Sequence, residues 1–382
     1  MTTDDTRYKI LFVDDDSDSP QARLRELFEG TSARVDILHP EDVLDENLAI
    51  SDVIIVDYFL TDWDERDEVE SAARSPRDGL AVVASLRSRL LPKLGQRSST
   101  RFPDRAVAFA LWSSNLAEAT FGLPSYVLPQ VFSRENNLEW AFNRSDILAP
   151  EGVAKILALA DATVRLATIW EPEDSRQPAD QLRKSLALAE TRWSDEAWND
   201  VLNCRPPLNE LGERTKGMAV ARWLLHRVLP YPTFLMDECE LRIRLRAQSL
   251  GNDGSPLREA LYASRYQGVM ESFAGTRWWR AAVEDWLYEA TEGDSSNPEA
   301  LEALSESIGY EFAKDWRRPV AVIDHDLRRS DLVQELDDVL RVRPDDWPVY
   351  ADPAYALVSE IHASDELRRI TDPLDLDRLR ST

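Results

Sequence analysis

The sequence contains few of the residues that bind transition metals or form disulfides. It has 2 cysteines and 4 histidines in 382 residues. Cys204 and Cys239 are far apart and the histidines lack metal-ligand spacing, so we expect two free buried thiols and no zinc site. The motifs G-x-x-x-x-G-K-[ST], G-x-S-x-G and H-E-x-x-H are absent too. ATPase, serine-hydrolase and zinc-protease activities therefore have no motif to support them.

Long apolar runs and an excess of positive charge are also missing. No stretch approaches the roughly 18 consecutive apolar residues of a membrane helix, and the N-terminus lacks the pattern of a signal peptide, so we expect a cytoplasmic protein without membrane association. The net charge of −25 argues against binding nucleic acid through bulk charge. Lysine is rare, and none occurs between Lys93 and Lys155.

Strand-like and helix-like stretches alternate over the first 170 residues. The expected strands are 9–13, 34–38, 52–59, 106–112 and 138–142. The expected helices are 21–30, 79–90, 124–136 (broken by Pro129) and 151–170. This alternation predicts an α/β domain with a flavodoxin-like, doubly wound, five-stranded parallel sheet. A functional site is then expected at the carboxyl ends of the strands.

The texture of the sequence changes after the first domain. The polar, proline-containing stretch 171–180 predicts a linker between a first domain, 1–170, and a second domain, 181–382. The second domain is expected to be mostly α-helical, with a short strand segment near 318–327. Three arginines between 241 and 248 would spread over the surface of a helix or line one face of a strand. Both interpretations stay open here.

Acidic and hydroxyl side chains follow three strands that should be neighbours in the sheet. Asp14, Asp15 and Asp16 follow the first strand, Asp57 ends the third, and Ser113 follows the fourth. Clustered carboxylates raise one another's pKa unless a cation neutralises them, and Mg²⁺ prefers such oxygen ligands. An aspartate beside the ion could accept a phosphoryl group. The alternative is a helix cap with solvated acids and ordinary strand-end turn residues.

These stretches resemble a known family. ILFVDDD, VIIVDYF, DGLAVVASLR and the serine after the fourth strand are similar to a bacterial response-regulator receiver domain over roughly residues 7–170. The resemblance implies that Asp57 is the phosphoacceptor, that Ser113 is the switch hydroxyl, and that a histidine kinase or another phosphodonor is the partner. It also implies a Mg²⁺ site formed by Asp14, Asp15, Asp57 and the main-chain carbonyl of Phe59.

The sequence departs from the receiver pattern in several places. Receivers have a lysine after the fifth strand, whereas the candidate here is Arg144, which is longer and planar. Trp112 is a bulky neighbour for Ser113, and the acidic segment 61–78 is long for a loop after a strand. These features resemble the divergent receiver-like domains of bacterial conflict and phage-defence systems, of which many are suspected to have lost phosphotransfer.

The sequence thus predicts a two-component-type signalling protein in which a divergent receiver is coupled to a helical protein-interaction module. A protein partner would bind the helical domain or segment 61–78. At most, the expected chemistry is autophosphorylation from a phosphodonor and autodephosphorylation. Three alternatives stay open: a pseudo-receiver scaffold, an effector enzyme around Asp324, His325 and Asp326, and a transcription regulator. The last is disfavoured by the net acidity and by the lack of a basic recognition helix.

Overall fold

The computed structural model describes residues 7–15, 20–60, 78–90, 106–114, 116, 129–170, 177–209, 217–376 and 378. The chain forms two compact units, Met1–Ser185 with Pro207–His226 and Leu186–Pro206 with Arg227–Thr382. Asp16 and nearly all of the acidic segment 61–78 lie outside the described residues. None of the helices within those ranges combines the length and apolar character needed to cross a membrane.

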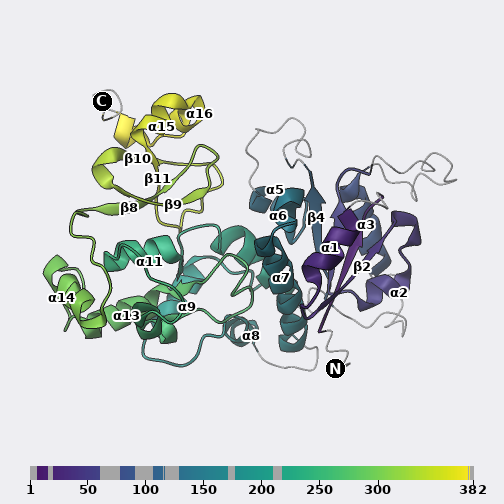
Figure 1. The fold of residues 1–382 in the computed structure, drawn as a ribbon, viewed down its shortest axis with the longest axis horizontal. Coiled ribbons are helices and arrows are strands. Elements are labelled where there is room, and N and C mark those ends of the chain that lie inside the picture. The colour runs from purple at the N-terminus through teal and green to yellow at the C-terminus, as the bar shows by residue number, and fades with distance from the viewer. Residues whose placement is uncertain are drawn as a thin grey trace. The chain divides into compact units, whose positions relative to one another are not determined.

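The first unit contains a five-stranded, all-parallel sheet with the order β2-β1-β3-β4-β5 (Figure 1). This is the α/β doubly wound fold that the alternation of strands and helices predicts. The strands are β1 (Tyr8–Val13), β2 (Ala33–Leu38), β3 (Val53–Asp57), β4 (Ala108–Ser113) and β5 (Trp140–Asn143). The described helices of this unit are α1 (Pro20–Phe28), α2 (Asp45–Ile50), α3 (Gly79–Leu90), α5 (Pro129–Glu135), α6 (Arg144–Ile147), α7 (Pro150–Ile169), α8 (Pro178–Ser185) and α10 (Met218–Trp223).

Both faces of the sheet are buried, which explains why β3 and β4 are apolar at successive positions. One face packs Leu11, Ile54 and Leu111 in a core that also contains Val82 and Leu86 of α3. On the other face, Phe12 contacts Phe28 of α1 and Trp112 of β4, with ring centroids 6.4 and 5.5 Å apart. Asp57 pairs in register with Trp112, so the two residues share this second face.

The helices of the first unit can be compared with the prediction where the structure describes them. Of the helix expected over 124–136, α5 is the described part, and Pro129 stands at its first position, where no N–H donor is needed. The six-residue α2 was not predicted, since so short a segment shows no apolar period. By contrast, α3 has the predicted bounds and α7 lies within one residue of them.

The second unit combines helices with short two-stranded sheets. Its described α-helices are α9 (Ser194–Asn203), α11 (Glu238–Leu245), α12 (Pro256–Ala260), α13 (Arg280–Ala290), α14 (Pro298–Ile308), α15 (Val358–Ala363) and α16 (Asp365–Arg369). Its strands pair antiparallel as β6 (Leu235–Met236) with β7 (Trp278–Trp279), β8 (Pro319–Ile323) with β9 (Arg329–Glu335), and β10 (Val339–Val342) with β11 (Ala354–Leu357).

The strand expected near 318–327 corresponds to β8, but the unit has more β-structure than the sequence predicts. In β9, RSDLVQE, five of the seven residues are polar or charged, and β10 and β11 are four residues each. Such strands lack the apolar alternation by which strands are detected. Of the arginines between 241 and 248, Arg242 and Arg244 lie on a helix, α11, and Arg246 caps its end. The Arg244 guanidinium donates a hydrogen bond to Glu284.

Candidate metal centre

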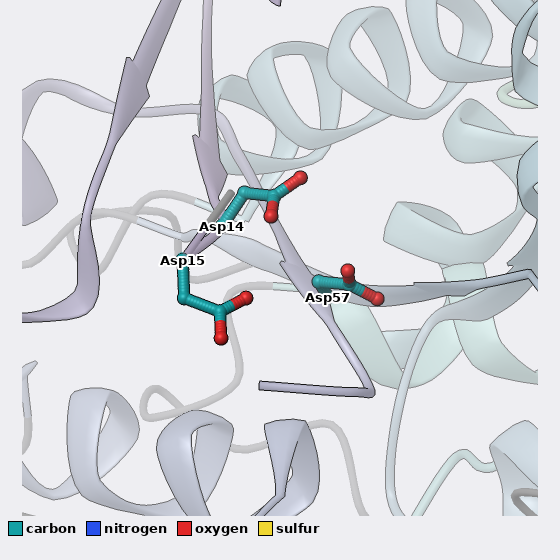
Figure 2. Close-up of side chains that lie close together, drawn as sticks. All are labelled: Asp14, Asp15 and Asp57. Carbon is teal, nitrogen blue, oxygen red and sulfur yellow. The ribbon is translucent and has the colours of Figure 1, made fainter. Parts of the chain in front are cut away.

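Three carboxylates meet at the carboxyl edge of the parallel sheet. Asp14 and Asp15 follow β1, and Asp57 is the last residue of the neighbouring β3. One oxygen from each lies within 4.8 Å of the other two, and Figure 2 shows the three side chains at the ends of these strands. All three residues are at most 8% exposed. Within the described part of the chain, no other group of three metal-ligating side chains is as close.

Within the cluster, the ionised form of Asp57 is disfavoured. Its pKa is raised from 3.8 to about 7, first by burial and then by the negative charge of Asp14. The Phe59 amide donates to Oδ1 of Asp57 at 3.3 Å and, with the charge of Arg144, lowers this pKa without restoring its ordinary value. A cation among the carboxylates would favour the ionised form of Asp57.

The donor set fits a small, hard divalent ion. Mg²⁺ binds oxygen at about 2.1 Å, so two of its ligand atoms lie at most about 4.2 Å apart. The 4.8 Å spread of the three carboxylates therefore needs only a small side-chain movement to reach bonding distance. Asp14, Asp15 and Asp57 are the residues that would hold the ion. The role of the Phe59 carbonyl as a further ligand stays a prediction.

Gly79 explains how the chain returns to the site after β3. The Gly79 amide donates to the Tyr58 carbonyl at 2.9 Å, and the Tyr58 amide donates to the Trp112 carbonyl at the same distance. A Cβ at position 79 would lie 2.1 Å from the Asp57 carbonyl oxygen. Only glycine lets α3 begin directly against the backbone of Asp57. A steric constraint thus explains why the DGLAVVASLR stretch has glycine at this position.

Arg144 lies close enough to the aspartate cluster for its charge to lower the pKa of Asp57. It opens α6 directly after β5, and its guanidinium stacks over the ring of the fully buried Trp112, 4.9 Å from the centroid. Because Trp112 is the register partner of Asp57, the stacking places Arg144 close enough to lower the pKa of Asp57. Trp112, the bulky residue that departs from the receiver pattern, is therefore the residue against which Arg144 packs.

Ser113 is buried at the carboxyl end of β4, at 3% exposure. It pairs with Asn143, one position beyond the pair formed by Asp57 and Trp112. Trp112, rather than Ser113, is therefore the β4 residue opposite Asp57. The assignment of Ser113 as a switch hydroxyl stays a prediction.

A second buried carboxylate, Glu139, was missed by the sequence analysis. Its side chain is fully buried at the start of β5, where Oε2 accepts the Phe109 amide and Oε1 accepts Nε of Arg222 at 2.7 Å. Arg87 approaches to 3.5 Å, and the His226 ring bonds the Glu139 carbonyl at 2.8 Å. The signal that could have found it is a single acid inside the apolar run LEWAF.

Asp324, His325 and Asp326 form the turn between β8 and β9. Oδ1 of Asp324 accepts the amides of Asp326 and Arg328, both at 2.9 Å, and the His325 side chain is 71% exposed. These contacts are those of a solvated hairpin turn. The exposure of His325 does not match the buried polar pocket that would favour an enzyme site at these residues.

Comparison of the sequence with family models gives no match, and no curated protein matches it. The receiver resemblance therefore stays a prediction from the quoted stretches. The parallel sheet and the buried acidic cluster at its carboxyl edge are what the structure itself establishes about the site.

Proposed function

We propose that the first unit is a divergent receiver domain of a two-component-type signalling protein, with Asp57 as the phosphoacceptor. One observation carries the proposal: three buried carboxylates from two adjacent strand ends lie within 4.8 Å of one another. A cluster with this charge would be costly to bury for structural reasons alone. A bound Mg²⁺ would neutralise the carboxylates and the oxygens of an incoming phosphoryl group.

The chain's own residues would act as follows. A carboxylate oxygen of Asp57 forms a bond to phosphorus, and the bond from phosphorus to the donor breaks with its electron pair leaving on the donor. The nucleophile must be ionised, and a pKa of about 7 leaves Asp57 partly protonated at neutral pH until a cation is present. Arg144, held on the Trp112 ring, supplies the positive charge that a lysine supplies in receivers.

The second unit would then be the module that binds a protein partner. Phosphorylation would add roughly −1.5 to −2 charges at the sheet edge, by analogy with other phosphorylated side chains. A role in a bacterial conflict or phage-defence system belongs to the same proposal and rests only on the resemblance of the quoted stretches.

A pseudo-receiver scaffold is the second candidate, and Arg144 is the observation that favours it. Its guanidinium is engaged with Trp112, and a planar, stacked arginine does not substitute freely for a mobile lysine. The effector-enzyme and transcription-regulator alternatives gain no comparable support from the described residues.

Intact-mass spectrometry after incubation with Mg²⁺ and acetyl phosphate tests the proposal. We expect one phosphoryl adduct on the wild type and on Asp42→Ala, which removes a carboxylate outside the cluster, and none on Asp57→Ala. An unmodified wild type would overturn the phosphoacceptor assignment.

The variant Arg144→Lys separates the two candidates. If the wild type stays unmodified but Arg144→Lys gains the adduct, the arginine has switched off an otherwise intact site and the protein is a pseudo-receiver. If neither protein is modified, the cluster has no phosphoacceptor role.

A further inference from the structure

The second unit contains a pocket of about 340 Å³ between α11, the start of α13, β8 and the start of β11. This volume is in the range of small-molecule binding pockets. β8 and β11 lie beside each other but belong to different two-stranded sheets. Residues of both strands line the pocket, Pro319 to Ile323 from β8 and Ala354 with Tyr355 from β11.

The charged residues of the lining, three arginines and three acids, neutralise one another. Each arginine has an acid as hydrogen-bond acceptor: Arg244 donates to Glu284, Arg280 to Asp352, and Arg329 to Glu240, at 2.6, 2.6 and 3.3 Å. An ionised group of a ligand would have to compete with one of these pairs or stay without a partner in a partly desolvated site. Both are costly, so the lining favours a ligand without charge.

The same ion pairs connect the walls of the pocket. The first joins α11 to α13, the second joins α13 to the segment before β11, and the third joins β9 to α11. Arg329 also forms an ion pair with Asp237 at 2.9 Å. Because the walls are held to one another by the protein's own contacts, a ligand would have little ordering of the site to bring about when it binds.

The remaining twelve lining residues are apolar or aromatic, among them Ile243 of α11 and Ile323 of β8. Trp347 is an aromatic part of the wall whose orientation is fixed. Its indole Nε1 donates to the Asp352 carbonyl at 2.8 Å, and its ring packs edge to face on Tyr231 with centroids 5.2 Å apart. An apolar ligand that packs against these residues would remove apolar surface from water on both sides of the contact.

We propose that this pocket binds an uncharged, mainly apolar small molecule. The apolar lining packs against the body of the ligand, and the mutually paired charges discriminate against ionised compounds of the same shape. All lining residues belong to the second unit, so the proposal does not depend on Asp57. It adds a small-molecule site to the unit for which we propose a protein partner.

Fluorescence titration of the full-length protein with N-phenyl-1-naphthylamine tests the proposal, because this uncharged probe brightens in apolar sites. We expect saturable binding of one probe per chain. The bound probe is then displaced with three naphthyl compounds of similar shape: 2-naphthylmethanol, 2-naphthoate and 2-naphthylmethylammonium. The uncharged alcohol should displace the probe at a concentration about tenfold or more below that needed for either ion.

Variants of lining residues locate the bound probe. Ile243→Trp and Ala321→Phe each place a larger side chain at the pocket, and each should weaken probe binding about tenfold or more. Leu374→Trp is the matched control, because it adds an aromatic side chain at a residue that is 80% exposed and does not line the pocket. It should leave the affinity for the probe unchanged.

The comparison of the three naphthyl compounds uses the wild type and keeps the test decisive if the lining variants fail to fold. The proposal is overturned if the probe does not bind saturably, if either ion displaces it as well as the alcohol does, or if a folded lining variant binds it with wild-type affinity.

Discussion

Buried carboxylates lie at both ends of the parallel sheet, and their surroundings differ. At the amino end, Glu139 accepts the Phe109 amide and Nε of Arg222. At the carboxyl end, Asp14, Asp15 and Asp57 lie together, and the pKa of Asp57 is raised to about 7. Glu139 thus has hydrogen-bonding partners on two other elements, whereas the pKa of Asp57 stays raised despite the nearby charge of Arg144.

The contacts of Glu139 are those of a structural acid, and the aspartate cluster is the candidate for a functional one. The Glu139 network joins elements far apart in sequence, since Arg222 is 83 residues away and Arg87 stacks on Phe109 at 4.8 Å. Through Arg222 and His226 it holds residues 217–226, which belong to the first unit, against the start of β5. The three buried aspartates form a group of oxygen ligands that could hold a divalent cation.

Removing Glu139 should have the largest effect on stability. Glu139→Ala leaves the Phe109 amide and the guanidinium of Arg222 without their buried acceptor. We expect the free energy of unfolding to fall by about 3 to 5 kcal/mol, as for other broken buried pairs. Urea denaturation followed by tryptophan fluorescence measures this change.

Glu135→Ala is the matched control, because Glu135 has a 65% exposed side chain whose ion pair is with the adjacent Arg134. It should cost less than about 1 kcal/mol. Equal losses for the two variants would mean that the Glu139 network is no more structural than a surface pair.

A substitution at Gly79 should have the next largest effect. The Cβ of Gly79→Ala would collide with the Asp57 carbonyl oxygen, so α3 must shift, at a cost of about 1 to 3 kcal/mol. Ala84→Ser, on the exposed side of α3, should change stability by roughly 0.5 kcal/mol or less. Thermal unfolding of both variants compares them, and a neutral Gly79→Ala would refute the close contact.

The smallest predicted effect is a pH dependence from His226. Burial lowers its pKa from 6.5 to about 4, against the opposing effect of Glu139. Between these values the unfolded chain binds more protons than the folded one, so the stability contribution is present above pH 6.5 and is lost as the pH falls toward 4.

Thermal unfolding of the wild type and His226→Gln at several pH values isolates this contribution. Between pH 7 and pH 5 the wild type should lose about 1 to 2 kcal/mol more than the variant. Parallel curves would show that His226 is not buried as a neutral ring.

The sequence predicts most of the first unit because its signals are local. The apolar stretch 52–59 predicts β3, and strand ends in a parallel sheet must share an edge, which brings Asp57 to Asp14 and Asp15. Arg144 was identified by its position after the fifth strand, and the structure places its charge near Asp57.

The features that the sequence does not predict depend on distant partners. In the sequence, Glu139 is one acid in an apolar stretch, and its role becomes visible only in the structure, where Arg222 donates to it. The return of 207–226 to the first unit carries no shift in composition. In the second unit, β9 is recognisable only through its pairing with β8.

Titration with Mg²⁺ in an isothermal calorimeter, on the wild type and Asp57→Asn, tests the central claim most directly. We predict that the wild type binds one ion and is stabilised against thermal unfolding, by about 2.7 kcal/mol at an ion concentration of 100 times Kd, whereas Asp57→Asn binds much more weakly. Equal binding by both proteins, or none by the wild type, would contradict the assignment of the aspartate cluster as a metal centre.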